Sequence, residues 1–218
     1  MNRKCFVSFV LFNAFFSALS CNFFKEIAKG IKKITEVLEN FNDNNCEKLQ
    51  EIFDNFYTVE NGKFYRSQQL SRDVLDYYLK EYKIKTLISL RWEDPEDWKE
   101  SEELAAKNNG ALFFNICMSA YRLSRKEDLI KLLYIYETAP KPILVHCAGG
   151  ADRTGEASAL WVLEIQKKSK KIAKQQLSLK YGHRVYKNSA KDFLIDIWGG
   201  KEWLLTVYNP DNYIQFKK

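Results

Sequence analysis

The chain has 218 residues, of which 46% are hydrophobic and 28% charged. This length and balance are ordinary for a soluble globular protein and allow one domain with a substantial core. Its 34 basic and 28 acidic residues give a net charge of +6, which suits an anionic substrate or a membrane surface, or is an ordinary solvated surface. Because only two histidines occur, a histidine-rich metal site is excluded.

The amino terminus has the pattern of an export signal. Two basic residues precede an apolar run at 5–19, which is shorter than the roughly 20 apolar residues of a membrane-spanning helix. Small side chains at Ala18 and Ser20 fit a cleavage site before Cys21, and the tetrapeptide ALSC is similar to a bacterial lipobox, whose cysteine is lipidated. We therefore expect a signal segment at 1–20 and a periplasmic or secreted protein. Lipid anchoring at Cys21 and an uncleaved anchor stay open.

Residues 21–50 are expected to form an amphipathic helix and a linker ahead of the main domain at 51–218. Apolar residues recur at helical spacing between positions 23 and 41, with lysines on the other face. Such a helix either packs on the domain or associates with a membrane surface, and both alternatives stay open. The polar stretch NDNNCE then predicts a loop.

From about residue 55, strand and helix patterns alternate. Strands are predicted at 63–69, 85–92, 111–118 and 141–147. The segment 85–92 is an apolar run with β-branched residues, and 63–69 is expected to be a short strand or an edge. The predicted helices have apolar residues at helical spacing, at 71–82, 93–110, 124–140 and 152–166. Ser71 is the expected N-cap of the first helix, and Ser124 with Glu127 predicts a capping box for the third. The alternation predicts an α/β fold with a central, mostly parallel sheet flanked by helices.

The stretch HCAGGADRT follows the last predicted strand, at the edge of a parallel sheet where ligands bind. Five residues separate Cys147 from Arg153, so the chain can curl into a cradle with both side chains facing one centre. Glycines let successive amides point inward, and the helix that follows adds its N-terminal amides and positive dipole end. We expect a nest for a tetrahedral oxyanion, built by Ala148, Gly149, Gly150 and Ala151.

The side chains around this nest have the types that nucleophilic attack on phosphorus needs. A positive field favours the thiolate form of a cysteine, which makes Cys147 the expected nucleophile. Arg153 would hold two oxygens of the anion with its planar fork. His146 would orient the loop by hydrogen bonding. Thr154 would donate its hydroxyl to the sulfur and so help the thiolate to leave.

The sequence HCAGGADRTG resembles the His-Cys-x5-Arg-Thr/Ser signature of the cysteine-dependent protein tyrosine and dual-specificity phosphatases. Its DRTG ending is similar to an atypical bacterial branch, as are YRSQQLS, KTLISLR and QLSLKYGH, so the resemblance covers residues 60–185. It implies a phosphatase fold, a cysteinyl-phosphate intermediate on Cys147 and no metal or organic cofactor. It also implies a phosphorylated protein or small phosphate as substrate, and no nucleic-acid partner. We expect a monomer.

The resemblance also implies a general acid, and the usual position for one holds no carboxylate here. In most of the family an aspartate on a separate loop before the cysteine protonates the leaving group, whereas this region reads FFNICMSAYRLS. Asp152, inside the loop, is the favoured replacement. Asp94 or Glu93 is the alternative, and Asp152 would then form a salt bridge or cap that holds Arg153.

Three other residues are candidates for substrate binding. Arg91 follows a predicted strand and would contact the substrate phosphate or form a surface ion pair. Tyr121 and Arg122 stand where the acid loop is expected and would line the pocket. His183 is interpreted as a structural, hydrogen-bonding histidine.

The residues leave the substrate class open. The chain would hydrolyse phosphotyrosine or phosphoserine/threonine in proteins, or it would hydrolyse inositol phosphates or other small phosphates. A non-catalytic phosphate-binding pseudophosphatase is supported only by the missing acid. A sulfurtransferase of the rhodanese kind is disfavoured, because those loops are shorter and do not require the Arg-Thr pair.

Overall fold

The computed structural model describes residues 43–92 and 97–216. The predicted export signal and amphipathic helix fall outside these ranges and remain predictions. The chain divides into two units, residues 1–53 and 54–218. Helix α3 (Asp43–Asp54) includes most of the stretch NDNNCE, so the loop predicted there is wrong. Asp and Asn are favoured at the start of a helix as well as in loops, which explains the difference. Within the described ranges, no helix is long and apolar enough to cross a membrane.

One sheet of five strands forms in the described part of the chain, in the order β1-β2-β5-β3-β4. The strands are β1 (Tyr57–Glu60), β2 (Phe64–Ser67), β3 (Thr86–Ser89), β4 (Leu112–Asn115) and β5 (Ile143–His146). Only the β1–β2 pair is antiparallel, which confirms the predicted α/β fold with a mostly parallel sheet. Strand β2, predicted as a short strand or an edge, lies inside the sheet and is buried throughout, because β1 covers its outer side.

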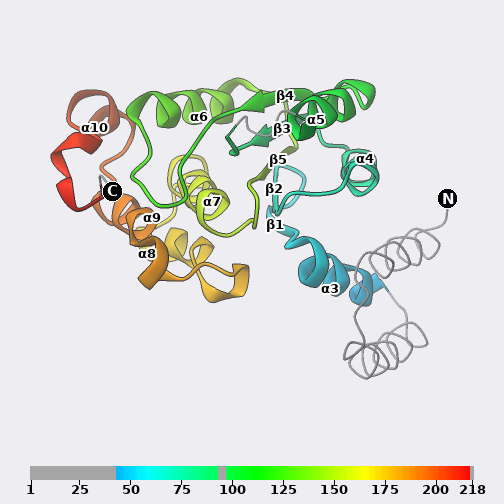
Figure 1. Cartoon of the computed structure of the whole chain (residues 1–218), viewed down its shortest axis with the longest axis horizontal. Helices are drawn as coiled ribbons and strands as arrows, with labels where there is room; N and C mark the ends of the chain where they lie inside the picture. Colours follow the sequence, from blue (N-terminus) through cyan, green and yellow to red (C-terminus); the bar gives the residue numbers. More distant parts are fainter. Residues whose placement is uncertain (1–42, 93–96, 217–218) are drawn as a thin grey trace. The chain divides into compact units, whose positions relative to one another are not determined.

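Helices cover both faces of the sheet (Figure 1). The helices after β2 are α4 (Arg72–Glu81), α5 (Asp97–Asn108), α6 (Lys126–Thr138), α7 (Asp152–Glu164), α8 (Lys170–Ala173), α9 (Val185–Ile197) and α10 (Lys201–Thr206). Of these, α8 and α9 pack on α7, and α10 packs on α6. Alternate strand residues point to opposite faces. Phe64, Ile88 and Val145 belong to the core cluster around α7, while α4 and α5 pack together on the other face. Helix α7 is buried along most of its length, and its Trp161 stacks on Phe64 with ring centroids 4.4 Å apart.

One of the two predicted helix starts is confirmed and the other is wrong. Ser71 stands at the N-cap of α4, but its side chain makes no capping hydrogen bond. The capping box of Ser124 and Glu127 is wrong, because α6 begins at Lys126 with Arg125 at its N-cap. The Ser124 hydroxyl is buried and instead donates to the Glu156 carboxylate on α7. A buried acceptor of this kind competes with a solvent-facing helix end for the same hydroxyl.

Candidate active site

The site lies at the carboxyl edge of the sheet, where three parallel strands end together. His146, the last residue of β5, is in register with Ser67 of β2 and Ser89 of β3. Cys147 follows directly and is 3% exposed. The loop from Cys147 leads into α7, which begins at Asp152 as the sequence predicted.

The carbonyl oxygens of three successive loop residues are held by donors from outside the loop. The hydrogen bonds run from Gln69 N to Ala148 O (3.0 Å), from Asn55 Nδ2 to Gly149 O (2.9 Å) and from Arg66 Nη2 to Gly150 O (2.7 Å). In a trans peptide the N–H of the next residue points opposite to the carbonyl. Holding these carbonyls outward therefore turns the next amides toward the loop centre, as an anion nest requires.

Gly150 is the position at which the loop depends on glycine. Its φ is +68°, in the left-handed region, and a Cβ there would lie 2.7 Å from Gln68 N and Ser67 O. A side chain would thus be both strained and in collision with the backbone of β2. The loop consequently packs directly on the end of β2.

Arg66 is a functional candidate that sequence reasoning missed. It is fully buried, and besides Gly150 O its guanidinium donates to the backbone and side-chain oxygens of Gln176, each at 2.8 Å. Its other face stacks on the Tyr181 ring, 3.8 Å from the centroid. Burial lowers the pKa of Arg66 to about 10, with Tyr181 and Cys147 acting in the opposite direction, so the side chain stays charged at neutral pH. An arginine inside the otherwise apolar β2 was the available signal.

Arg153 is anchored on one edge of its guanidinium. Nη1 donates to Leu90 O at 3.0 Å and to Met118 O at 3.5 Å. Nε is buried and has no hydrogen-bond partner among the described residues. Thr154 Oγ1 is likewise buried and unpartnered in the described part of the chain, so the predicted hydrogen bond to the Cys147 sulfur is not formed in this structure.

His146 connects the loop to α5. Its Nδ1 lies 3.4 Å from Cys147 O, and its Nε2 lies 3.2 Å from Glu102 Oε1. Glu102 is 3% exposed and also accepts a hydrogen bond from the Gln69 side chain. His146 Nε2 makes no hydrogen bond among the described residues, so Glu102 is its neighbour at ion-pair distance and the orienting role of His146 stays a prediction.

Asp152 is paired with His183. Asp152 Oδ1 lies 2.6 Å from His183 Nδ1, and His183 Nε2 lies 2.6 Å from Asp192 Oδ2 on α9. Burial alone would lower the pKa of His183, but the hydrogen bonds and charges of Asp152 and Asp192 raise it to about 9. The imidazole is therefore an imidazolium at neutral pH. His183 is thus a partner of the Asp152 carboxylate, whereas the alternative prediction had Asp152 holding Arg153.

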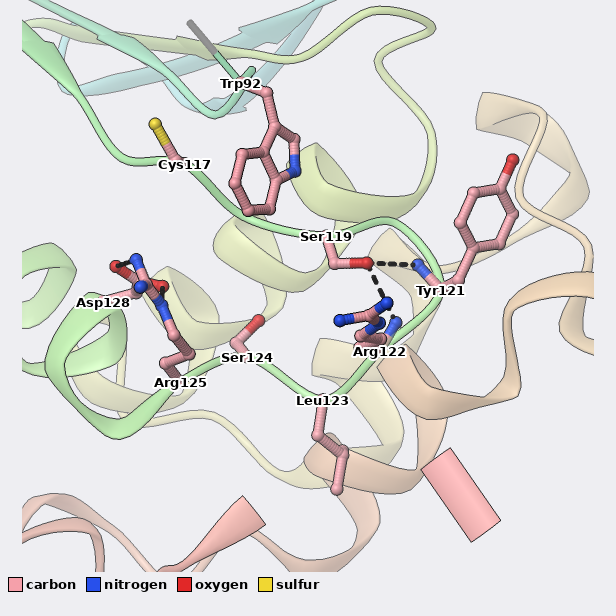
Figure 2. Close-up of a pocket in the computed structure, with 9 residues that line it drawn as sticks. All are labelled: Trp92, Cys117, Ser119, Tyr121, Arg122, Leu123, Ser124, Arg125 and Asp128. Atoms are coloured by element: carbon pink, nitrogen blue, oxygen red, sulfur yellow. Dashed lines mark hydrogen bonds and ion pairs between the residues drawn. The ribbon is translucent and has the colours of Figure 1, made fainter. Parts of the chain in front are cut away.

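A pocket of about 520 Å³ lies along the segment between β4 and α6 (Figure 2). Its lining residues are Trp92, Cys117, Ser119, Tyr121, Arg122, Leu123, Ser124, Arg125 and Asp128. Met118, whose carbonyl holds Arg153, stands between two of these residues. Arg125 is neutralised by Asp128, with Nε 2.8 Å from Oδ2. Tyr121 and Arg122 are both exposed and line this pocket, and their contact with substrate stays a prediction.

A family model described as "DSP-PTPase phosphatase fused to NAD+ Kinase" matches residues 35–192. The chain belongs to this phosphatase family. The match confirms the resemblance to cysteine-dependent tyrosine and dual-specificity phosphatases. No curated protein matches the chain.

Solved structures share the phosphatase fold. P. aeruginosa TpbA in complex with pTyr is 19% identical, with 66% of this chain and 85% of that chain covered and a TM-score of 0.52. The core catalytic domain of the PP-IP phosphatase SIW14 from S. cerevisiae, in complex with citrate, is 23% identical, with 68% and 87% covered and a TM-score of 0.55. At these identities the likeness shows the fold alone.

The segment 113–124 is the one where this phosphatase family was expected to carry its general acid. It is bound at Arg122 and Ser124 by side chains of α7 and α9. Lys191 Nζ lies 2.7 Å from Glu156 Oε2, and both side chains are fully buried. The same ammonium donates to Arg122 O at 3.0 Å and to Ser124 Oγ at 3.1 Å. The buried ion pair therefore holds the pocket wall at Arg122 and Ser124 in place.

Of the remaining residues predicted to belong to the site, Arg91 contacts a residue that binds the loop, and Asp94 and Glu93 lie outside the residues that the structure describes. Arg91 Nη1 donates to Gln69 Oε1 at 2.8 Å, and its guanidinium carbon lies 4.6 Å from the centroid of the Trp98 ring. Asp94 and Glu93 lie outside the described residues, so their role as an alternative acid remains a prediction. In the described ranges, no cluster of His, Cys, Asp or Glu side chains is suited to hold a metal ion.

Proposed function

We propose that this phosphatase hydrolyses phosphomonoesters through a cysteinyl-phosphate intermediate on Cys147. The observation that carries the proposal is the loop itself, in which three carbonyls are bound from outside and the intervening amides are turned inward. The buried and unpartnered Nε of Arg153 supports it, since a buried N–H without an acceptor is costly and a phosphate oxygen would supply one.

In the first step the Cys147 thiolate attacks phosphorus, an S–P bond forms and the bond from phosphorus to the ester oxygen breaks. The loop amides and Arg153 stabilise the charge on the equatorial oxygens. In the second step water attacks phosphorus, the S–P bond breaks and inorganic phosphate leaves. Thr154 would donate its hydroxyl to the departing thiolate.

Asp152 is the proposed donor of the proton that the leaving oxygen takes up. Its side chain is 20% exposed, and its Oδ1 is held by His183. Asp94 and Glu93 remain the alternative. Asp152→Asn should slow hydrolysis of an ester with a poor leaving group far more than hydrolysis of an activated aryl phosphate, because only the former needs an acid. Similar losses on both substrates would assign Asp152 a structural role.

For the substrate, we propose a phosphorylated protein, with phosphotyrosine as the first candidate. The exposed ring of Tyr121 in the pocket supports an aromatic ester, and the solved TpbA complex contains pTyr. Small phosphates such as inositol phosphates are the second candidate, supported by the fold shared with a PP-IP phosphatase and by the exposed Arg122 in the pocket. A phosphotyrosine peptide and an inositol phosphate, compared by kcat/KM, distinguish the two.

The decisive experiment is hydrolysis of para-nitrophenyl phosphate by the full chain, with chelator present, from about pH 4.5 to about pH 8. We expect chelator-resistant activity that is lost in Cys147→Ser. A folded protein that binds phosphate or vanadate without turnover would instead be a pseudophosphatase.

For the amino terminus, we propose export with cleavage before Cys21. The support is the sequence of residues 1–21 alone. The mass of the mature protein, purified from its native host, gives both the cleavage position and any lipid on Cys21. A full-length mass would exclude cleavage.

A further inference from the structure

Three side chains form a hydrogen-bonded row behind the phosphate loop. Asp192 on α9 contacts His183 Nε2, and His183 Nδ1 contacts Asp152, the first residue of α7. The His183 side chain is fully buried, whereas the Asp152 side chain is 20% exposed. Both ring nitrogens face carboxylates, and a histidine donates from both only when it is protonated. The row therefore carries a fixed positive charge between two negative ones.

Without His183, the Asp152 carboxylate could bind the N–H groups at the start of α7 and so compete with phosphate for them. A carboxylate in the first turn of a helix ordinarily accepts hydrogen bonds from the unpaired N–H groups at that end and is attracted by the helix dipole. Those N–H groups are the ones that a bound phosphate needs here. The N-cap residue of α7 is Ala151, which makes no side-chain capping hydrogen bond, and the Asp152 carboxylate contacts His183.

Asp152 also lies next to Arg153 in the chain. A carboxylate close to the bound phosphate repels it, and this repulsion is strong where water is excluded. The imidazolium of His183, at hydrogen-bond distance from Asp152, offsets that charge.

We propose that His183 is a positioning residue for substrate binding: it holds Asp152 to one side of the loop, so that the amides and Arg153 are open to the phosphate. Asp192 orients the ring. The inference rests on the proposed function, because it assigns the loop a phosphate to bind.

The test measures the affinity of inorganic phosphate by calorimetry in the full chain carrying Cys147→Ser, so that no turnover is needed. We expect His183→Gln to weaken phosphate binding roughly tenfold, the scale of one interaction between two unit charges a few ångströms apart in a solvated site. Asp152→Asn should bind phosphate at least as well as the parent. The double variant His183→Gln/Asp152→Asn should recover the affinity of Asp152→Asn to within about twofold, because the interfering carboxylate is gone.

A matched control is Asp196→Asn on the same helix, where the carboxylate pairs with Lys174 at 2.8 Å. It should leave the phosphate affinity unchanged. Unchanged affinity in His183→Gln, or a double variant as weak as His183→Gln, would overturn the proposal and leave His183 a purely structural role. If His183→Gln does not fold, Asp192→Asn replaces it, with a smaller expected loss that Asp152→Asn again reverses.

A pH series supplies a second readout. The charged groups that act on His183 are Asp152 from α7 and Asp192 from α9, and with them the pKa of His183 is about 9. Phosphate affinity of the Cys147→Ser protein should fall as the pH rises through this value, and Asp152→Asn should abolish the fall. The same slope in both proteins would contradict the proposal. Normal phosphate binding without any hydrolysis by the unmutated chain would refute the proposed function while leaving this inference intact.

Discussion

The protonation of His183 predicts a specific dependence of stability on pH. Its ordinary pKa of 6.5 is raised to about 9 in the folded protein. The folded state thus binds the proton more tightly than the unfolded state, and the resulting stabilisation is complete below the unfolded pKa and lost as the pH rises through the folded one. A shift of this size corresponds to about 3 kcal/mol, since each pKa unit is worth about 1.4 kcal/mol.

Urea unfolding of the unmutated chain and of His183→Gln, between about pH 6 and about pH 9.5, measures this contribution. The difference in the free energy of unfolding between the two proteins should shrink by about 3 kcal/mol across the range. The series stops at this upper pH because burial raises the pKa of Tyr78, Tyr136 and Tyr208. At higher pH these tyrosines would ionise in the unfolded chain but not in the folded one, and this would lower the free energy of unfolding of both proteins. Parallel curves for the two proteins would show that His183 is not held as an imidazolium.

Three further substitutions test the packing around the loop. Gly150→Ala should lower the free energy of unfolding in urea by at least about 2 kcal/mol and abolish phosphate binding. The reason is that the left-handed backbone strain adds to the collision of the new Cβ with backbone atoms 2.7 Å away at the end of β2. Full stability of this variant would contradict the loop geometry. Arg66→Met should lower kcat/KM for para-nitrophenyl phosphate by at least about tenfold by releasing Gly150 O, and Arg66→Lys should not rescue it, since an ammonium cannot bridge the same acceptors. Lys191→Met should destabilise the fold by about 3–5 kcal/mol, because the Glu156 charge stays buried and uncompensated. Adding Glu156→Gln should recover most of this loss. Unchanged stability of Lys191→Met would refute the buried ion pair.

The sequence alone was sufficient for the loop and its setting. A buried strand, the spacing from Cys147 to Arg153 and the glycines between them define a backbone conformation within one short window, and short-range rules apply there. The alternation of strands and helices likewise predicted the parallel sheet. Where the same rules failed, at Ser124, a buried acceptor on another helix outcompeted the local cap.

Only the tertiary structure supplied the groups that hold the loop. Arg66 and Asn55 bind loop carbonyls 84 and 94 residues further along the chain, and His183 reaches Asp152 from 31 residues away. The sequence indicated Arg66 only as an arginine within a strand and His183 only as a structural histidine, because their partners are set when residues distant in the chain pack beside the loop. The sequence of this protein therefore determined which residues form the loop and which of them are candidates for binding and attacking a phosphate. Folding decided what keeps them in place, since hydrogen-bond partners at such separations are selected by packing and burial.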